Sequence, residues 1–268
     1  MSAEDIFGEV LQAIKTHHPD LLVRDHLNQE GFEHILKFLR DHANNLETYS
    51  FRMHWFSTEN RLKVVMPTFL HECVGSWMYK AIGRAARSGL LPNAWDDTID
   101  MMPAPECQNF VGRHAGSFKE PDMAFVPRIG PSRGECASFP SVVVESGWQE
   151  SATRHLDDAR LWLEGSGNAV RVVLQAKYHQ SNESGRIHFV LSVSRAHPDG
   201  LGCTISPTYY DIFPIPQLVI QNPTISFAEF YSGDCPDGME PETQIPFDLA
   251  LFRETAAVCI RREGYIPA

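Results

Sequence analysis

Two carboxylates at the ends of short apolar runs are the residues with the clearest capacity for chemistry. Asp122 stands near the start of the run 121–127, and Glu145 ends the run 141–145. Paired carboxylate oxygens suit a hard cation such as Mg2+, which keeps several waters and can turn one of them into a nucleophile. If both runs are strands of one sheet, the sequence predicts that the two carboxylates share a metal site.

Each candidate residue also has a structural explanation when it is taken alone. A Pro-Asp pair such as Pro121-Asp122 is typical of a turn, and a strand-end Glu145 could pair with a nearby arginine. Glu72, in a predicted first helical turn, is favoured by the helix dipole without any ligand. His71 in the same turn is more often structural or solvated. The functional interpretation therefore depends on the joint placement of Asp122 and Glu145.

The periodicity of apolar residues predicts the elements that position these side chains. Helices are predicted over 3–16, 29–43, 70–87, 150–163 and 247–262, a hairpin over 48–66, and strands near 108–112, 121–127, 142–144, 169–176, 187–193, 216–220 and 225–230. Strand, helix and strand in succession are typical of a parallel crossover. The sequence thus predicts an α/β fold with a mixed central sheet flanked by helices. We expect an N-terminal helical pair as an extension over 1–47 and an α/β domain over 48–268, in one compact unit.

Composition limits the classes of partner. The 268 residues carry a formal net charge of -11, which disfavours nucleic acid because a nucleic-acid-binding domain usually presents a basic face. A local basic groove remains a hypothesis, with the candidates Arg84, Arg87, Arg113, Lys119, Arg128 and Arg133. The six cysteines include no C-x-x-C pair, so a zinc cluster is not indicated. With no apolar run near the ~18 residues of a membrane span, we expect a soluble intracellular protein without membrane contact, in cytoplasm or nucleus.

Three motifs together resemble a known superfamily. They are Pro67-Thr68-x-x-His71-Glu72, Lys119-Glu120-Pro121-Asp122 and Val143-Val144-Glu145-Ser146-Gly147-Trp148. The predicted elements follow the order of a helix with an acidic residue, a strand with Pro-Asp, a strand that ends in glutamate, a helix and a further strand. This order resembles the restriction-endonuclease-like, or PD-(D/E)XK, superfamily. The resemblance is closest to a branch common in filamentous fungi and covers about residues 48–195. It implies a restriction-endonuclease-like sheet and a metal-dependent nuclease acting on phosphodiesters.

The same resemblance implies roles for individual residues. Asp122 and Glu145 would ligate Mg2+ or Mn2+ together with the backbone carbonyl after Glu145, and Glu72 would help to orient the metal or its water. A lysine two residues after the glutamate would steady the nucleophile, but that position is Gly147, which supplies no charge. Lys177 on the next predicted strand is a candidate replacement. Lys119 and the amide of Gln149 are alternatives, and substrate contacts are expected from His71, Lys119, Trp148 and Gln149.

A competing hypothesis keeps the scaffold and changes the chemistry. The acidic charge, the glycine at 147 and the many aromatic residues would suit a fold reused for an apolar small molecule, since a fold does not fix a function. The carboxylates would then serve an isomerisation or cyclisation without metal, such as the pericyclic, Diels-Alder-type chemistry of fungal secondary metabolism. Its pocket walls are expected from Tyr49, Phe51, Trp55, Trp77, Trp148, Tyr209, Tyr210 and Phe213, although large rings are more often core. A binding module without catalysis is the third possibility.

Overall fold

The computed structural model describes residues 2–148, 152–180, 185–198 and 203–268. The chain forms two compact units. Unit 1 comprises residues 1–68 and 106–120, and unit 2 comprises residues 69–105 and 121–268. Each unit has its own sheet and its own hydrophobic core. Within the described ranges, no helix combines the length and the apolar character needed to cross a membrane.

Unit 1 combines two helices with a small antiparallel sheet. Its elements are α1 (Ala3–Thr16), β1 (Leu21–Arg24), α2 (Gln29–Leu39), the 3-10 helix His42–Asn44, β2 (Arg52–Phe56), β3 (Arg61–Val65), the 3-10 helix Gly112–His114 and β5 (Phe118–Lys119). The sheet has the order β1-β3-β2-β5. Ser2 and Asp5 form a capping box at α1, and Asn28 caps α2 by accepting the Gly31 N–H. The predicted N-terminal helical pair is therefore confirmed.

The predicted hairpin forms as β2 and β3, and it lies in unit 1. Trp55 of β2 is fully buried, stacks on Phe32 of α2 with ring centroids 5.0 Å apart, and donates its Nε1–H to Gln29 at 2.8 Å. An isolated hairpin cannot bury its apolar face, so it packs with the helices that share its core. The first segment of unit 1 therefore extends to residue 68, beyond the expected boundary at 47, and residues 106–120 add β5 to the same sheet.

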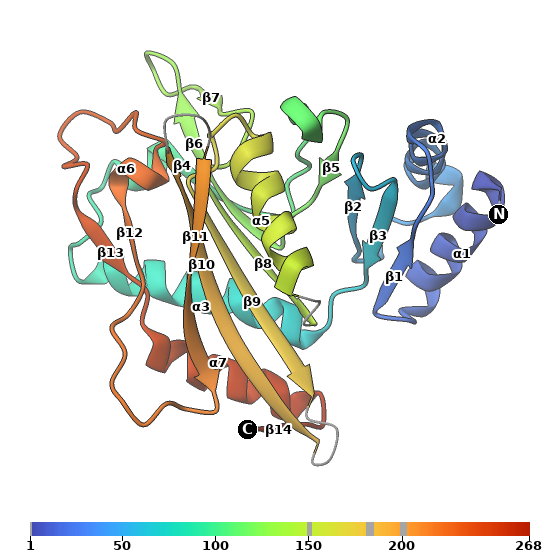
Figure 1. Ribbon diagram of the computed structural model, residues 1–268. Coiled ribbons are helices and arrows are strands. Elements are labelled where there is room, and N and C mark those ends of the chain that lie inside the picture. Colours follow the sequence, from blue (N-terminus) through green and yellow to red (C-terminus); the bar gives the residue numbers. More distant parts are fainter. Residues whose placement is uncertain (1, 149–151, 181–184, 199–202) are drawn as a thin grey trace. The chain divides into compact units, whose positions relative to one another are not determined.

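Unit 2 is a mixed α/β unit built on a large twisted sheet (Figure 1). Its helices are α3 (Phe69–Arg87), α4 (Trp95–Thr98), α5 (Ala152–Gly165), α6 (Phe227–Phe230) and α7 (Leu249–Arg262). Its strands are β4 (Ile99–Pro103), β6 (Met123–Ile129), β7 (Glu135–Cys136), β8 (Val142–Trp148), β9 (Val172–Gln180), β10 (Arg186–Pro198), β11 (Cys203–Phe213), β12 (Thr224–Ser226), β13 (Gln244–Pro246) and β14 (Ile266–Pro267).

The sheet of unit 2 has the strand order β11-β10-β9-β8-β6-β4, with β14 beside β10 and β7 beside β6. Strands β8 and β9 run parallel and are joined through α5, whereas β6 pairs with β8 and with β4 in antiparallel fashion. The predicted crossover is confirmed, and the strands predicted near 121–127, 142–144 and 169–176 are neighbours in this sheet. The succession α3, β4, β6, β8, α5, β9 contains the element order on which the superfamily resemblance rests, and the mixed α/β fold class is confirmed.

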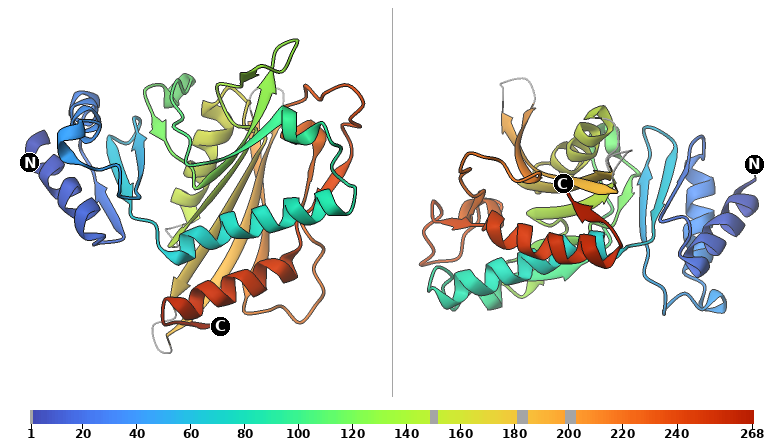
Figure 2. Two further views of the ribbon diagram at one scale, coloured as in Figure 1. Left: turned by 180° about the vertical axis from the view of Figure 1, so that it is seen from behind. Right: turned by 90° about the horizontal axis from the view of Figure 1, so that it is seen from below.

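Helices cover both faces of this sheet. Helices α3 and α7 lie along one face and α5 lies along the other (Figure 2, right). Val142 and Val144 of β8 belong to the core shared with α3 and α7, where Trp77 stacks on Phe252 at a centroid distance of 4.2 Å. Side chains alternate along a strand, so Val143, between these two valines, and Glu145, after them, point to the opposite face of the sheet. Glu145 therefore faces α5.

Three predicted strands have other structures. Residues 216–220 form a loop in which the side chains of Leu218 and Val219 are 82% and 102% exposed. Prolines on both sides of this apolar run, Pro216 and Pro223 among them, deprive the backbone of ladder donors, which explains the error. The run 225–230 divides into β12 and α6. Residues 108–111 form no strand and lead into the 3-10 helix that begins at Gly112.

Candidate functional site

Asp122 and Glu145 occupy corresponding positions on neighbouring strands of unit 2. In the antiparallel register of β6 and β8, Met123 pairs with Val144. Asp122 immediately precedes Met123, and Glu145 immediately follows Val144. Continuing the register by one residue sets the two carboxylate-bearing residues across from each other at one end of the β6–β8 pair. The two strands therefore bring both predicted ligands to the same end of the sheet.

Asp122 is held by the residue that follows Glu145. Its Oδ2 atom accepts the Ser146 backbone N–H at 2.7 Å and lies 2.8 Å from the Ser146 hydroxyl. The same hydroxyl lies 2.9 Å from the backbone carbonyl of His71 in the first turn of α3. Ser146 thus joins the start of β6, the end of β8 and the start of α3. This contact fixes the orientation of the Asp122 carboxylate.

Glu145 is buried on the α5 side of the sheet. Its side chain is 5% exposed, and its Oε1 atom accepts the indole N–H of Trp162 at 2.5 Å. In the parallel register, Glu145 pairs with Gln175, whose Nε2 lies 3.4 Å from Asp158 of α5. A buried carboxylate requires such donors because an ionised group loses its hydration on burial. One oxygen of Glu145 is therefore held by a side-chain donor from α5.

Lys177 lies beside Gly147, the position where the resemblance implies a lysine. The two residues pair in the parallel register of β8 and β9. A Cβ atom built on Gly147 would lie 3.9 Å from Lys177 Nζ and 3.8 Å from His71 Nε2. The His71 ring is buried, and the Tyr178 hydroxyl lies 3.1 Å from its Nδ1 and 3.2 Å from its Nε2. The amine of Lys177 and the imidazole of His71 thus adjoin the side-chain position that glycine leaves open.

Four other predicted site residues have different positions. Glu72 is exposed on the first turn of α3, next to the buried His71, because successive helical residues point in directions about 100° apart. Lys119 belongs to unit 1, is fully buried and places its Nζ 5.3 Å from the centre of the Phe56 ring. Trp148 ends β8 in register with Tyr178, and only its backbone is described. Gln149 lies outside the described residues.

The carboxylate oxygens of Asp122 and Glu145, at one end of the β6–β8 pair, are of the ligand type that Mg2+ prefers. Mg2+ is commonly bound through one or two carboxylates, with waters and substrate phosphates completing an oxygen shell. Asp122 and Glu145 each have one oxygen held by a protein donor, as is typical of ligands that an outer layer of hydrogen bonds orients. Across the described ranges, no group of three or more His, Cys, Asp or Glu side chains could hold a metal ion. Among these side chains, a metal ion at the strand ends would therefore depend on Asp122 and Glu145 alone, with water or substrate oxygens as its other ligands.

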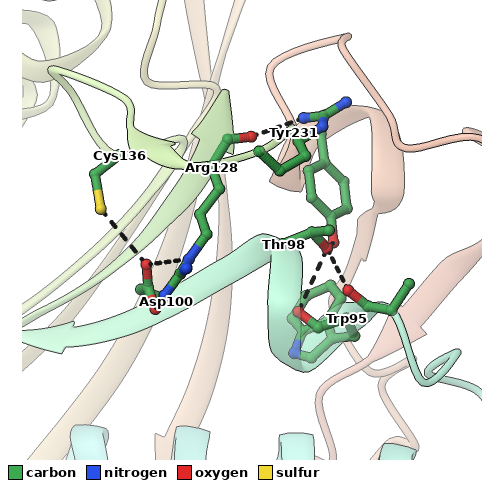
Figure 3. A network of polar contacts seen from close by, with 8 residues as sticks. Trp95, Thr98, Asp100, Arg128, Cys136 and Tyr231 are labelled. Atoms are coloured by element: carbon green, nitrogen blue, oxygen red, sulfur yellow. Dashed lines mark hydrogen bonds and ion pairs between the residues drawn. The ribbon is translucent and has the colours of Figure 1, made fainter. Parts of the chain in front are cut away.

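Several candidates for a basic groove are engaged in ion pairs within unit 2. Arg128 contacts Asp100 through two nitrogens at 3.0 and 3.1 Å (Figure 3). The hydrogen bond from Arg128 lowers the pKa of the Asp100 carboxyl. Arg133 pairs with Asp234 at 3.3 Å, and Arg84 pairs with Asp248 at 3.0 Å. These pairs reduce the positive potential that the three arginines could present to a polyanion.

The aromatic residues of the competing hypothesis are divided between two cores. Trp55 packs in unit 1, whereas Trp77 and Phe213 are buried in unit 2. One cavity in unit 2, of about 570 Å3, has a mainly polar lining and does not include the candidate carboxylates. It is lined by Arg195, Tyr210, Ile220, Gln221, Asn222, Thr224, Ser226, Glu229 and Gln244. Of the predicted aromatic walls, this cavity contains Tyr210 alone.

Three contacts of the site were missed at the level of sequence. Ser146 lies within a quoted motif, yet nothing in its spacing indicates that it would hold Asp122. Trp162 lies in the helix predicted over 150–163. A buried indole N–H needs an acceptor, and this need is the signal that could have linked Trp162 to Glu145. Tyr178 alternates into the core on β9, where its hydroxyl requires a partner in the same way, and that partner is His71.

Comparison with known proteins gives limited information. No protein-family profile matches the chain, and no curated protein matches it. A crystal structure from Anabaena variabilis, described as a "putative nuclease belonging to DUF820", is similar with a TM-score of 0.43 and 11% sequence identity. The similarity covers 76% of this chain and 90% of that chain. Because the TM-score is below 0.5, the description of the fold rests on the strand order and connectivity given above.

Proposed function

We propose that the protein is a metal-dependent phosphodiester hydrolase of the nuclease type whose catalytic lysine has moved from one strand to the next. The observation that carries the proposal is the position of the Lys177 amine, 3.9 Å from the Cβ position of Gly147. Position 147 lies two residues after Glu145 and pairs with position 177 on the parallel strand β9. A lysine at either position can reach the same space. Lys177 then supplies the positive charge that Gly147 lacks.

The residues of the site divide into three roles. Asp122 and Glu145 would hold Mg2+ or Mn2+, and the ion would supply Lewis-acid stabilisation and an acidified water. Lys177 stabilises negative charge that develops on the phosphate in the transition state. His71, whose ring is oriented by Tyr178, is the substrate contact and has its Nε2 3.8 Å from the Cβ position of Gly147. Glu72, exposed next to His71, would help to orient the metal or its water.

A nuclease assay with a metal titration tests this function. Wild-type protein should cleave at least one of single-stranded DNA, double-stranded DNA or RNA when Mg2+ or Mn2+ is present, and chelation should abolish the cleavage. Asp122→Asn and Glu145→Gln should both remove the activity and weaken Mn2+ binding by calorimetry, because each removes an anionic ligand while conserving shape. Asp100→Asn is the matched control, since its carboxylate pairs with Arg128 away from the strand ends. Absence of both cleavage and metal binding would overturn the proposal.

A second candidate function is a small-molecule cyclase or isomerase that uses the carboxylates without metal. It is favoured by the ion pairing of Arg84, Arg128 and Arg133, which leaves these cations poorly suited to bind a long polyanion. It predicts no cleavage of any nucleic acid, no calorimetric signal with Mg2+ or Mn2+, and a thermal shift with apolar ligands. The same assay series therefore distinguishes the two candidates.

A further inference from the structure

Helices α3 and α7 pack side by side in an antiparallel register. The Phe69 backbone N–H donates to Glu263 at 2.8 Å near one end, and Arg84 pairs with Asp248 at 3.0 Å near the other. Arg84 lies as many residues after Phe69 as Asp248 lies before Glu263. One register thus relates both contacts. It sets position 73, four residues after Phe69, opposite position 259, four residues before Glu263.

Both of these opposed positions are cysteines. Cys73 is fully buried and Cys259 is partly exposed. The two thiols share a hydrogen bond, which raises the pKa of Cys73 and lowers the pKa of Cys259 to about 7. Lys80 and Arg262 also favour the Cys259 thiolate, whereas burial and Glu263 oppose it. Cys259 is therefore the more acidic thiol of the pair, and Cys73 keeps its proton to higher pH.

We propose that Cys73 and Cys259 are a redox-active dithiol that closes to a disulfide between α3 and α7. The accessible Cys259 thiolate attacks one sulfur of a small disulfide oxidant, forms a mixed disulfide and releases one thiolate. Cys73 then loses its proton and attacks the Cys259 sulfur, which expels the second small thiol. Two electrons pass from the cysteine pair to the oxidant, and two small thiols are the products. The bond joins two segments of unit 2 that are far apart in sequence.

Oxidised glutathione is a suitable probe for this reaction. Wild-type protein should lose the mass of two hydrogen atoms without retaining glutathione, and peptide mapping should find one peptide that links Cys73 to Cys259. Cys73→Ser should stop at a glutathione adduct on Cys259, and Cys259→Ser should form no link. Cys136→Ser, which removes an exposed cysteine in another part of unit 2, should behave as wild type. If Cys73→Ser does not fold, the comparison of wild type with Cys259→Ser still decides.

Thermal unfolding provides an independent readout. Because the disulfide closes a long loop, oxidised wild-type protein should unfold at a Tm higher by roughly 5–10 °C than reduced protein, and dithiothreitol should reverse the shift. Cys259→Ser should show no such shift. A stable glutathione adduct on wild-type Cys259, a link to any other cysteine, or two thiols that both remain free to alkylate after oxidation would overturn the proposal. None of these readouts requires catalytic activity.

Discussion

The Lys177 amine lies 3.9 Å from the place that a Cβ atom would take on Gly147, its partner in the parallel register of β8 and β9. The two positions can therefore present a cation to the same space from neighbouring strands. His71 Nε2 is 3.8 Å from the same point, so a side chain added at Gly147 meets ordinary van der Waals neighbours rather than backbone. The location of the proposed catalytic lysine can therefore be tested by moving the lysine from one strand to the other.

The first prediction is that Lys177→Met lowers kcat for Mg2+-dependent cleavage by roughly 10²–10³, because the charge that stabilises the transition state is lost. Adding Gly147→Lys to that variant should restore part of the activity, since the new side chain starts in the same space. Lys80→Met, which removes a lysine that contacts Thr255 on α7, serves as control and should keep wild-type kcat. Equal activity of Lys177→Met and wild type would exclude the role of Lys177.

The second prediction concerns the serine that holds Asp122. Ser146→Ala removes the hydroxyl at 2.8 Å but keeps the backbone N–H at 2.7 Å, so Asp122 should remain near its position with one donor fewer. We expect a loss of about 1–2 kcal/mol in the free energy of unfolding and weaker Mn2+ binding. Urea titration and calorimetry measure the two effects. An unchanged Mn2+ affinity would show that Ser146 does not orient the ligand.

The third prediction compares two tryptophans that differ in the acceptor of their indole N–H. Trp162 donates to the buried carboxylate of Glu145, whereas Trp77 donates to the backbone carbonyl of Asp248 at 2.9 Å. Trp162→Phe and Trp77→Phe remove similar volumes, but only the first takes a donor from a buried charge. We expect Trp162→Phe to cost about 1–2 kcal/mol more in urea unfolding. Equal costs would indicate that the Glu145 carboxyl gains little from Trp162.

The fourth prediction is a pH dependence in unit 1. Burial raises the pKa of Glu120 from 4.5 to about 7, although the Met53 N–H at 2.5 Å acts in the opposite direction. The native state therefore binds a proton that the unfolded chain releases, so this contribution to stability is complete below pH 4.5 and is lost as the pH rises through about 7. Glu120→Gln should remove that loss.

Chemical unfolding near pH 5 and near pH 8 measures this effect. The Glu120→Gln variant should equal wild type at the lower pH and exceed it by up to roughly 3 kcal/mol at the higher pH. Glu30→Gln, on the first turn of α2, is the control and should leave the pH dependence unchanged. Parallel pH profiles for wild type and Glu120→Gln would contradict the prediction.

Local periodicity was sufficient to predict most elements of this fold. The helix over 3–16 and the crossover from β8 through α5 to β9 follow from patterns within about twenty residues, as does the final amphipathic helix. The strands β4 and β11 were missed because their partners are chosen by pairing across the sheet. The assignment of β2 and β3 to unit 1 depends in the same way on contacts with α2 that no local pattern contains.

The candidate site was predictable in its residue types and less so in its arrangement. Asp122 and Glu145 could be placed on adjacent strands from sequence, because Asp122 begins one apolar run and Glu145 ends the next. The choice among Lys177, Lys119 and Gln149 could not be made, since the offset between two parallel strands joined by a helix is set by packing. Hydrogen bonds from Ser146 and Trp162 likewise depend on side-chain directions that only the assembled sheet determines.

The division of the chain into units has a consequence for its synthesis. Unit 1 is made of residues 1–68 and 106–120, so the chain passes from one unit to the other at 68/69, at 105/106 and at 120/121. On the ribosome, β5 and the buried Phe118 emerge only after α3 and β4 of unit 2 have been made. Unit 1 therefore cannot complete its sheet until part of unit 2 has been made, although it holds the N-terminus. A single proteolytic cut at residue 68 would also divide unit 1 itself, because residues 106–120 would stay in one chain with unit 2 and residues 1–68 would not.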